Sequence, residues 1–250
     1  MNEWLDDLRT AVAFLTRLPI PHPESPTSAD FPRAQRVFPI AGAAIGAAVG
    51  LICLGMRIVG VPDLAAAALA LGASALLTGA LHEDGLADVA DGFGGGRDRA
   101  AKLEIMRDSR LGTYGALALM VSFVAKLSAL AALPDAAIVQ SLIATHALAR
   151  AVLPAMSMRL AYARNDGLAA NAGRPDSATV GAAGAFALVI TLLLLPWIDA
   201  LCAALAAAAC AAAMAWLAQR QIGGQTGDVL GAAEQVCETA ILVLLAAWLA

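Results

Sequence analysis

The most chemically suggestive stretch of the sequence is HEDGLADVADGFGGG, in which acidic residues follow an apolar run. Asp84, Asp88 and Asp91 are separated by four and three residues, so a helix would place them on one face. Carboxylates on one face repel one another, and a hard divalent cation with oxygen ligands, above all Mg²⁺, would offset that repulsion. The stretch therefore predicts a magnesium site.

The same stretch contains Glu83, Gly85 and Gly92. Glycine weakens a helix by about 1 kcal/mol relative to alanine, so we interpret the two glycines as positions where a bulky ligand approaches the backbone. The alternative is an acidic cap at a membrane interface, which would require neither a helical register nor glycines.

A second segment, RDSRLGTYG, offers groups that bind phosphate. Arg107 and Arg110 present planar guanidinium groups suited to phosphate oxygens. Gly112 and Gly115 would leave backbone N–H groups near a helix start free to meet an anion. Asp108 is either a ligand or the ion-pair partner of a neighbouring arginine. The alternative interpretation is a basic anchor on the cytoplasmic side of a membrane.

Charged residues also occur within the later apolar runs. His146 and Arg150 are one helical turn apart, and they are either packing residues or substrate-binding residues. Glu234 and Glu238 are also one turn apart, and an unpaired buried carboxylate is costly, so they should meet a cation in the protein interior. Asp228 precedes them at a helix start, where it is either a metal ligand or a partner of the helix dipole.

Two further residues have alternative interpretations. His82, beside the acidic stretch, is a candidate phosphate donor or orienting group, although a lone histidine is more often a packing residue. Arg17, in the segment FLTRLPIP, is either a phosphate ligand or an anchor whose stem lies along the membrane while its charge reaches water.

Composition indicates what must position these residues. The 250 residues are 60% hydrophobic and 14% charged, against about 45–50% and 25% in soluble domains. A bilayer core needs about 20 apolar residues per helix. We therefore predict an all-α fold, a polytopic integral membrane bundle of about seven transmembrane helices forming a single membrane domain over residues 1–250. Nothing in the sequence suggests nucleic-acid binding.

The expected order begins with an amphipathic interfacial helix over residues 1–18, followed by a bundle over residues 37–250. Most of the 16 Lys and Arg residues fall in segments that share one side of the membrane. The positive-inside rule then predicts a cytoplasmic N-terminus, an active site facing the cytoplasm, and a multi-pass protein of the cell inner membrane. The expected spans cover residues 37–59, 64–81, 111–133, 136–157, 179–195, 198–217 and 229 to the C-terminus.

Five segments of this chain resemble signature segments of the cobalamin synthase family, the adenosylcobinamide-GDP ribazoletransferases. They are FLTRLPIP, FPIAGAAIG, LTGALHEDGLADVADG, RDSRLGTYG and GGQTGDVLGAAEQ, and together they extend from Phe14 to Gln235. The third segment is the most specific. The resemblance implies a Mg²⁺-dependent phosphoryl transfer that joins adenosylcobinamide-GDP to α-ribazole or its 5′-phosphate and releases GMP, with the ribazole 5′-hydroxyl as the nucleophile.

With that reaction in view, each candidate residue has an expected role. We expect Mg²⁺ to be held by Asp84, Asp88, Asp91 and Asp228. Glu83, or whichever carboxylate is left unligated, would accept the hydroxyl proton, with Asp88 and His82 as the other catalytic candidates. The expected substrate-binding residues are Arg17, Arg107, Arg110, His146 and Arg150.

Two other functions remain open from the sequence. One is a lipid phosphotransferase of the CDP-alcohol type, whose pattern fits Asp88, Asp91 and Asp228 but has an aspartate where this chain has Ala232. The other is a cation transporter, which would need carboxylates near the middle of the membrane without arginine-rich loops beside them. The sequence leaves open whether the chain forms a homo-oligomer.

Overall fold

The computed structural model describes residues 3–20, 30–164 and 173–249. Within these ranges the regular structure is helical, apart from one isolated bridge between Tyr162 and Gln225. The helices are α1 (Glu3–Leu15), α2 (Asp30–Ala34) with the 3-10 turn Gln35–Val37, α3 (Phe38–Ile58), α4 (Asp63–Thr78), α5 (Leu81–Gly95), α6 (Arg99–Ile105), α7 (Thr113–Ala132), α8 (Asp135–Arg159), α10 (Ser177–Leu194), α11 (Trp197–Ile222) and α12 (Gly227–Leu249).

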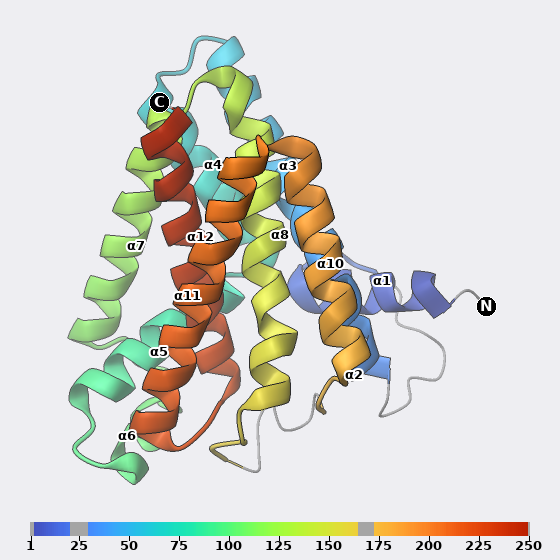
Figure 1. Ribbon diagram of the computed structural model, residues 1–250. Coiled ribbons are helices and arrows are strands. Elements are labelled where there is room, and N and C mark those ends of the chain that lie inside the picture. Colours follow the sequence, from blue (N-terminus) through green and yellow to red (C-terminus); the bar gives the residue numbers. More distant parts are fainter. Residues whose placement is uncertain (1–2, 21–29, 165–172, 250) are drawn as a thin grey trace.

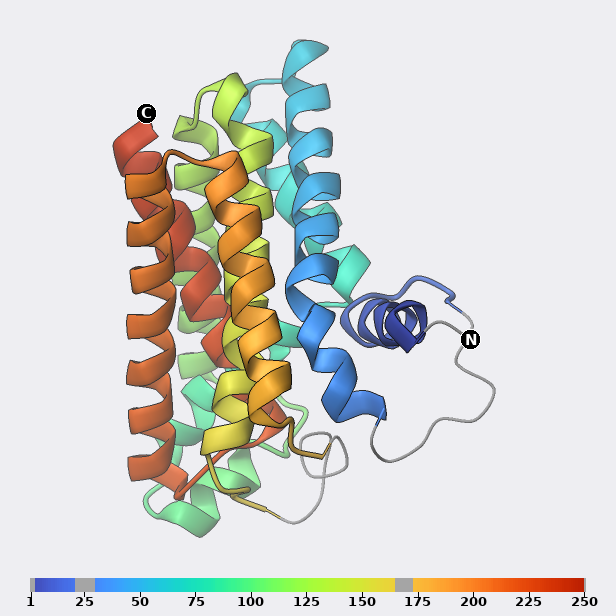
Figure 2. The same cartoon turned by 45° about the vertical axis from the view of Figure 1, so that its right-hand side comes forward.

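The long helices form a bundle around α8, which packs against α3, α10, α11 and α12 (Figures 1 and 2). Six helices are long and apolar enough to cross a membrane, and the α4–α5 pair would make a seventh span. Outward faces of α7, α10 and α11 carry large exposed apolar side chains such as Val121, Leu193 and Leu205. The predicted polytopic helical membrane fold is confirmed, and six of the expected spans lie within a few residues of their helices.

Glycines determine how closely α3 approaches α8. A Cβ atom on Gly42 or Gly46 would overlap a backbone carbonyl of α8, and one on Gly50 would lie 2.9 Å from the Cα atom of Val139. Small residues spaced four apart let two helix backbones approach in this way. The α3 glycine stripe therefore fixes the position of the central helix.

The second expected span is broken. Helix α4 ends at Thr78, and the next two residues, Gly79 and Ala80, both adopt positive φ angles, 69° and 55°. Helix α5 then leaves at 92° to α4. Arg17 lies at this break: its backbone N–H donates to the carbonyl of Leu77 at 2.7 Å, and its side chain covers Gly79 so closely that a Cβ atom there would overlap it. The acidic stretch is therefore a separate helix rather than the end of a straight span.

Helix α1 lies across the long helices instead of parallel to them (Figure 2). It has an exposed face with Trp4 and Leu5, and it is tied to the bundle by the buried Asp7, which forms ion pairs of 3.0 Å with Arg33 and 2.6 Å with Arg36. The helix covers residues 3–15 of the segment 1–18 expected to be an amphipathic helix, and its location at the membrane interface stays a prediction.

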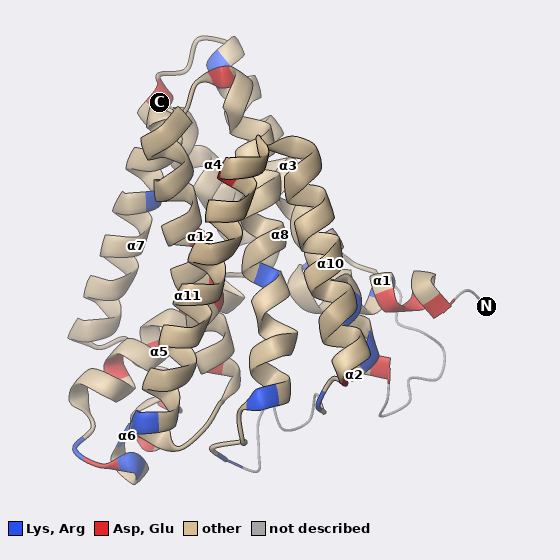
Figure 3. Cartoon of the chain, viewed as in Figure 1, with Lys and Arg blue, Asp and Glu red and all other residues tan. Residues whose placement is uncertain are grey.

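Charged residues gather at the end of the bundle that holds α5 and α6, and beside α1 and α2, with a smaller group at the opposite end (Figure 3). Two segments between expected spans at the α5–α6 end are partly helical. Helix α6 lies between the expected spans 64–81 and 111–133, and α11 continues beyond the expected end of its span, residue 217, to Ile222 before the tight turn that leads into α12.

Candidate active site

Three predicted metal ligands meet where α5 packs against the start of α12. Asp84 and Asp228 line the same pocket. Asp88 is half-buried, and the carboxylates that act on its charge are those of Asp84, Asp228 and Asp91, with Arg164 as the opposing cation. The fold thus brings Asp228 to the acidic face of α5 across more than a hundred residues of sequence.

Glycines make this close packing of α5 and α12 possible. A Cβ atom on Gly85 would lie 2.8 Å from the backbone oxygen of Asp228 and 3.2 Å from the Cα atom of Gly231. Likewise, Gly92 packs against Met106 at the end of α6. The expectation that Gly85 and Gly92 admit a bulky ligand is therefore wrong, because neighbouring protein segments occupy the space beside both.

Asp91 has a partner within the protein. Its two carboxylate oxygens accept hydrogen bonds from the backbone N–H groups of Gly112, at 2.7 Å, and Gly115, at 2.9 Å, at the start of α7. The prediction that these two N–H groups are free for a substrate anion is wrong, because the anion they bind is Asp91. This carboxylate ties α5 to α7, whether or not it also contacts a metal.

The turn GGQTGD, which positions Asp228, is held by contacts that the sequence did not reveal. Gln225 is buried and donates from its side-chain amide to the carbonyls of Ser157 and Leu160 at the end of α8. Arg99 of α6 donates to the carbonyls of Ile222 and Ala163, both at 2.7 Å. Since side-chain-to-carbonyl contacts leave no sequence periodicity, only the folded structure identifies Gln225 and Arg99 as supports of the site.

Asp228 itself has two polar neighbours. Arg164 approaches its Oδ2 atom at 3.3 Å, and the hydroxyl of Thr226 donates to the same oxygen at 3.1 Å. Asp228 belongs to the first turn of α12, where the partial positive charge of the helix N-terminus also stabilises a negative group. Arg164 was not among the residues predicted from the sequence, and it is the arginine that the structure brings to the acidic cluster.

The predicted phosphate-binding arginines are exposed. Arg110 forms a forked pair with Asp108 at 2.5–3.0 Å while its side chain stays 87% exposed, so Asp108 is an ion-pair partner of this arginine. Hydrogen bonds from Arg110 lower the pKa of the Asp108 carboxyl below its usual value. Arg107 is exposed on the same turn, and Arg17 is exposed at the α4–α5 break. Their contacts with substrate stay a prediction.

His82 points away from the exposed acidic face into the interior. Its Nδ1 atom lies 3.4 Å from Glu234, and the other oxygen of Glu234 pairs with Arg150 at 2.5 Å. Arg150 is 1% exposed and is among the largest fully buried side chains. The buried carboxylate therefore meets an arginine, as expected, and the guanidinium predicted to bind substrate is engaged by protein.

The second buried carboxylate, Glu238, has three basic neighbours. Lys126 lies 3.0 Å away, the Nδ1 atom of His146 3.3 Å away, and Arg150 3.4 Å away. Lys126 also donates to the side-chain oxygen of Gln235 at 2.7 Å. Together with Glu234 and His82 these side chains form a buried network of charges joining α5, α7, α8 and α12.

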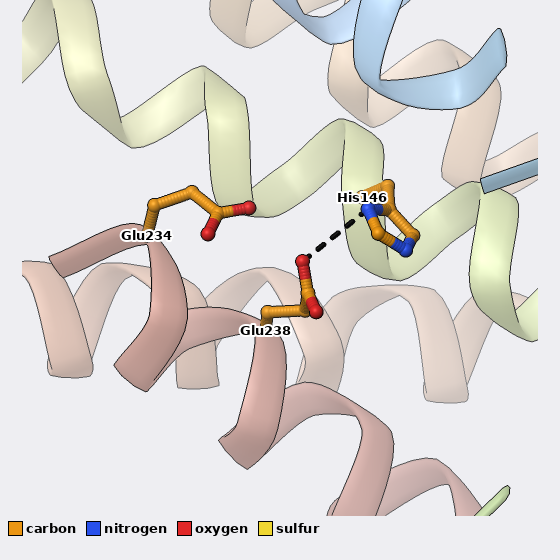
Figure 4. Close-up of side chains that lie close together, drawn as sticks. All are labelled: His146, Glu234 and Glu238. Carbon is orange, nitrogen blue, oxygen red and sulfur yellow. Dashed lines mark ion pairs between the residues drawn. The ribbon is translucent and has the colours of Figure 1, made fainter. Parts of the chain in front are cut away.

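Of the described His, Cys, Asp and Glu side chains, one set of three brings its ligand atoms within 4.8 Å of one another: His146, Glu234 and Glu238 (Figure 4). The aspartates of the acidic face are more widely spaced. However, the buried glutamates are already paired with Arg150 and Lys126, whereas three carboxylates, those of Asp84, Asp228 and Asp91, act on the charge of Asp88 alongside the cation Arg164. The carboxylate-rich donor set of α5 and α12 therefore fits a hard divalent cation better.

Glu83 lies apart from the aspartates. It lines a second pocket together with Lys126 and Gln235, and the charges that act on it are those of Lys126, Glu238 and Arg150. One residue along a helix rotates a side chain by about 100°, so Glu83 and Asp84 point in different directions. The geometry does not favour Glu83 as the base that serves the acidic face.

Comparison with known proteins agrees with the resemblance in the sequence motifs. The chain is 48% identical to a protein of Bradyrhizobium diazoefficiens over 97% of this chain and 94% of that protein. It is 46% identical to one of Azorhizobium caulinodans over 96% of this chain and 94% of that protein. Both relatives are named adenosylcobinamide-GDP ribazoletransferase. No solved structure matches the chain.

The family whose sequence pattern matches this chain is described as cobalamin-5-phosphate synthase, and the match runs from residue 7 to residue 246. It therefore includes the acidic helix α5, the buried charges of α7, α8 and α12, and the turn that holds Asp228. With relatives this similar along nearly its whole length, the chain belongs to the cobalamin-5-phosphate synthase family.

Proposed function

We propose that this chain is an adenosylcobinamide-GDP ribazoletransferase that uses Mg²⁺ and carries out the last step in assembling the nucleotide loop of a cobamide. The observation that carries the proposal is that Asp84 and Asp228 line one pocket at the charged end of the bundle and that both carboxylates act on the charge of Asp88. The names of the relatives supply the substrates. Carboxylates arranged in this way suit a reaction that displaces one phosphate ester by another.

In the proposed reaction a ribose hydroxyl of ribazole attacks the phosphorus attached to cobinamide. A new P–O bond forms, the P–O bond to GMP breaks, and the hydroxyl proton passes to a carboxylate. Asp84, Asp88 and Asp228 are the residues that would hold the cation, with Asp91 mainly engaged by α7. When bound, Mg²⁺ would neutralise charge on the pyrophosphate and the departing GMP. The proton acceptor is then the aspartate of this set that is left free of the cation.

The family description corrects one expectation about the nucleophile. A cobalamin 5′-phosphate is named as the product, and an oxygen that already carries a phosphate cannot attack a second phosphorus. The proposed nucleophile is therefore a ribose hydroxyl other than the 5′-hydroxyl expected from the sequence. Both α-ribazole and its 5′-phosphate can then react in the same orientation.

The orientation in the membrane is part of the proposal. Most Lys and Arg residues belong to the α5–α6 end of the bundle or to α1 and α2 (Figure 3). The positive-inside rule puts such an end in the cytoplasm, where the nucleotide-activated substrates are available. We propose a multi-pass protein of the cell inner membrane whose acidic face opens to the cytoplasm.

The two alternatives have less support. A CDP-alcohol phosphotransferase would need a carboxylate where this chain has Ala232, which is fully buried. A cation transporter would need mid-membrane carboxylates able to receive an ion, and Glu234 and Glu238 are instead paired with Arg150 and Lys126.

The proposal is tested with purified protein in nanodiscs, adenosylcobinamide-GDP, α-ribazole and Mg²⁺, following GMP release and cobamide formation together. We expect equal amounts of both products, loss of turnover with EDTA, and at least a hundredfold lower turnover for Asp88→Asn. Asp63→Asn, an exposed carboxylate at the far end of α4, is the matched control. Well-folded wild-type protein that forms no cobamide would overturn the proposal.

A further inference from the structure

The pocket that Asp84 and Asp228 line also contains three phenyl rings, which have no role in the reaction steps proposed above. It has a volume of about 110 Å³ and lies between the N-terminal helices and the α5, α8 and α12 helices. Phe14, Phe31 and Phe38 are part of its lining, and so are Asp84 of α5 and Asp228 of α12. One cavity therefore combines phenyl rings and carboxylates in its lining.

The three phenyl rings form a compact cluster from three helices. Phe14 and Phe38 are nearly parallel at 5.9 Å between ring centres, with an interplanar angle of 12°. Phe31 meets Phe14 edge-on at 4.7 Å and Phe38 at 6.0 Å. Phe38 is buried, whereas Phe14 and Phe31 are half-buried. Rings held in this way offer a rigid surface to another flat ring, because aromatic groups prefer offset and edge-on arrangements.

The polarity of the pocket limits what it binds. Among the described residues that line it there is no lysine or arginine, while Asp84 and Asp228 each carry a carboxylate. A phosphate group is repelled by such a lining unless a cation intervenes, whereas an uncharged aromatic group is not. Clefts for drug-sized ligands measure about 300–1,000 Å³, so this pocket suits one ring system rather than a corrinoid or a whole nucleotide.

We propose that this aromatic pocket binds the fused-ring base of ribazole and directs its ribose towards Asp84 and Asp228. The inference rests on the proposed function, and it assigns Phe14, Phe31 and Phe38 as the residues that recognise the acceptor. The acceptor is the smaller and less charged of the two substrates. Its base stacks among the phenyl rings, and its hydroxyl then reaches the carboxylates that line the same cavity.

Two other occupants are chemically conceivable and give different results. The guanine of the leaving GMP is also a flat ring, and a lipid tail would fit an apolar wall. Guanine, however, carries amide and amine groups that need polar partners, and phenyl rings offer none. A lipid tail has no group that would interact with the carboxylates, and changing the pocket would then leave the KM of both substrates unchanged.

The test compares the KM values for the two substrates separately. Stacking on an aromatic side chain is worth roughly 1–3 kcal/mol per base, which corresponds to about 5- to 150-fold in affinity. We expect Phe31→Ala to raise KM for α-ribazole by that factor and to leave KM for adenosylcobinamide-GDP within twofold. Phe31→Tyr, which keeps the ring, should restore the wild-type KM. Phe123→Ala, a half-exposed ring on α7 outside this pocket, should change neither.

The outcomes separate the inference from the proposed function. If the variants are active and KM rises for adenosylcobinamide-GDP alone, the pocket binds guanine. If neither KM changes, the pocket holds lipid or no ligand. Either result overturns the inference and leaves the proposed function intact. Wild-type protein without transferase activity overturns both. If Phe31→Ala does not fold, Phe31→Leu and Phe14→Leu keep an apolar side chain in place, and the same comparison of KM values decides.

Discussion

Arg150 offers a sharp test of the buried charge network. It is 1% exposed and pairs with Glu234 at 2.5 Å and with Glu238 at 3.4 Å. Replacing it with methionine keeps much of the volume but leaves Glu234 with His82 and an amide as its nearest polar partners. Removing one partner of a buried ion pair costs about 3–5 kcal/mol, because the other charge stays buried without compensation.

For a chain of this size each kcal/mol shifts the unfolding midpoint by about 2–4 °C, so Arg150→Met should lower the midpoint by about 6–20 °C. The assay is thermal unfolding in nanodiscs, followed by tryptophan fluorescence. Adding Glu234→Gln should recover most of the loss, since no uncompensated charge then remains. Arg220→Met, at the exposed end of α11, is the control and should stay within about 0.5 kcal/mol of wild type. A midpoint for Arg150→Met within 2 °C of wild type would refute the reasoning.

Three further predictions concern the supports of the acidic face. Gly85→Ala should lower the unfolding free energy by about 1–3 kcal/mol and reduce turnover, because the new Cβ atom would meet the α12 backbone. The control Gly72→Ala, where the space beside the residue is open, should change neither the unfolding free energy by this mechanism nor the turnover. Asp91→Ala should cost about 0.5–2 kcal/mol in a denaturant titration through loss of the α7 cap, and Asp91→Asn, which keeps an acceptor oxygen, should cost less; equal losses would contradict this. Arg99→Ala should raise the Mg²⁺ concentration needed for half-maximal turnover by releasing the turn before α12, whereas the exposed Arg97→Ala should not.

The spans could be predicted because apolar runs of bilayer length must form helices when no water satisfies their backbone groups. The glycine stripe of α3 is also a regular pattern, because small residues at a spacing of four leave a continuous groove for α8. The helical register of Asp84, Asp88 and Asp91 was likewise correct. In each case the determinant is local periodicity, which a sequence displays directly.

The break between α4 and α5 could not be predicted, because it depends on two consecutive residues with positive φ, one of which is Ala80. Nor could periodicity indicate that the N–H groups of Gly112 and Gly115 bind Asp91, or that Gly85 faces α12. These are contacts between distant segments. A glycine or a free N–H group leaves room for a partner, and only the fold determines whether that partner is a ligand or another helix.

The central claim is that the aspartates of α5 and α12 hold the catalytic cation, and electron paramagnetic resonance of Mn²⁺, used in place of Mg²⁺, tests it most directly. Titrating Mn²⁺ into wild-type protein in nanodiscs should show bound metal that Mg²⁺ displaces, and Asp88→Asn should remove most of that binding. Glu234→Gln, measured well below its unfolding temperature, should keep it. Metal binding that survives Asp88→Asn but is lost in Glu234→Gln would contradict the account and move the metal site to the buried glutamates.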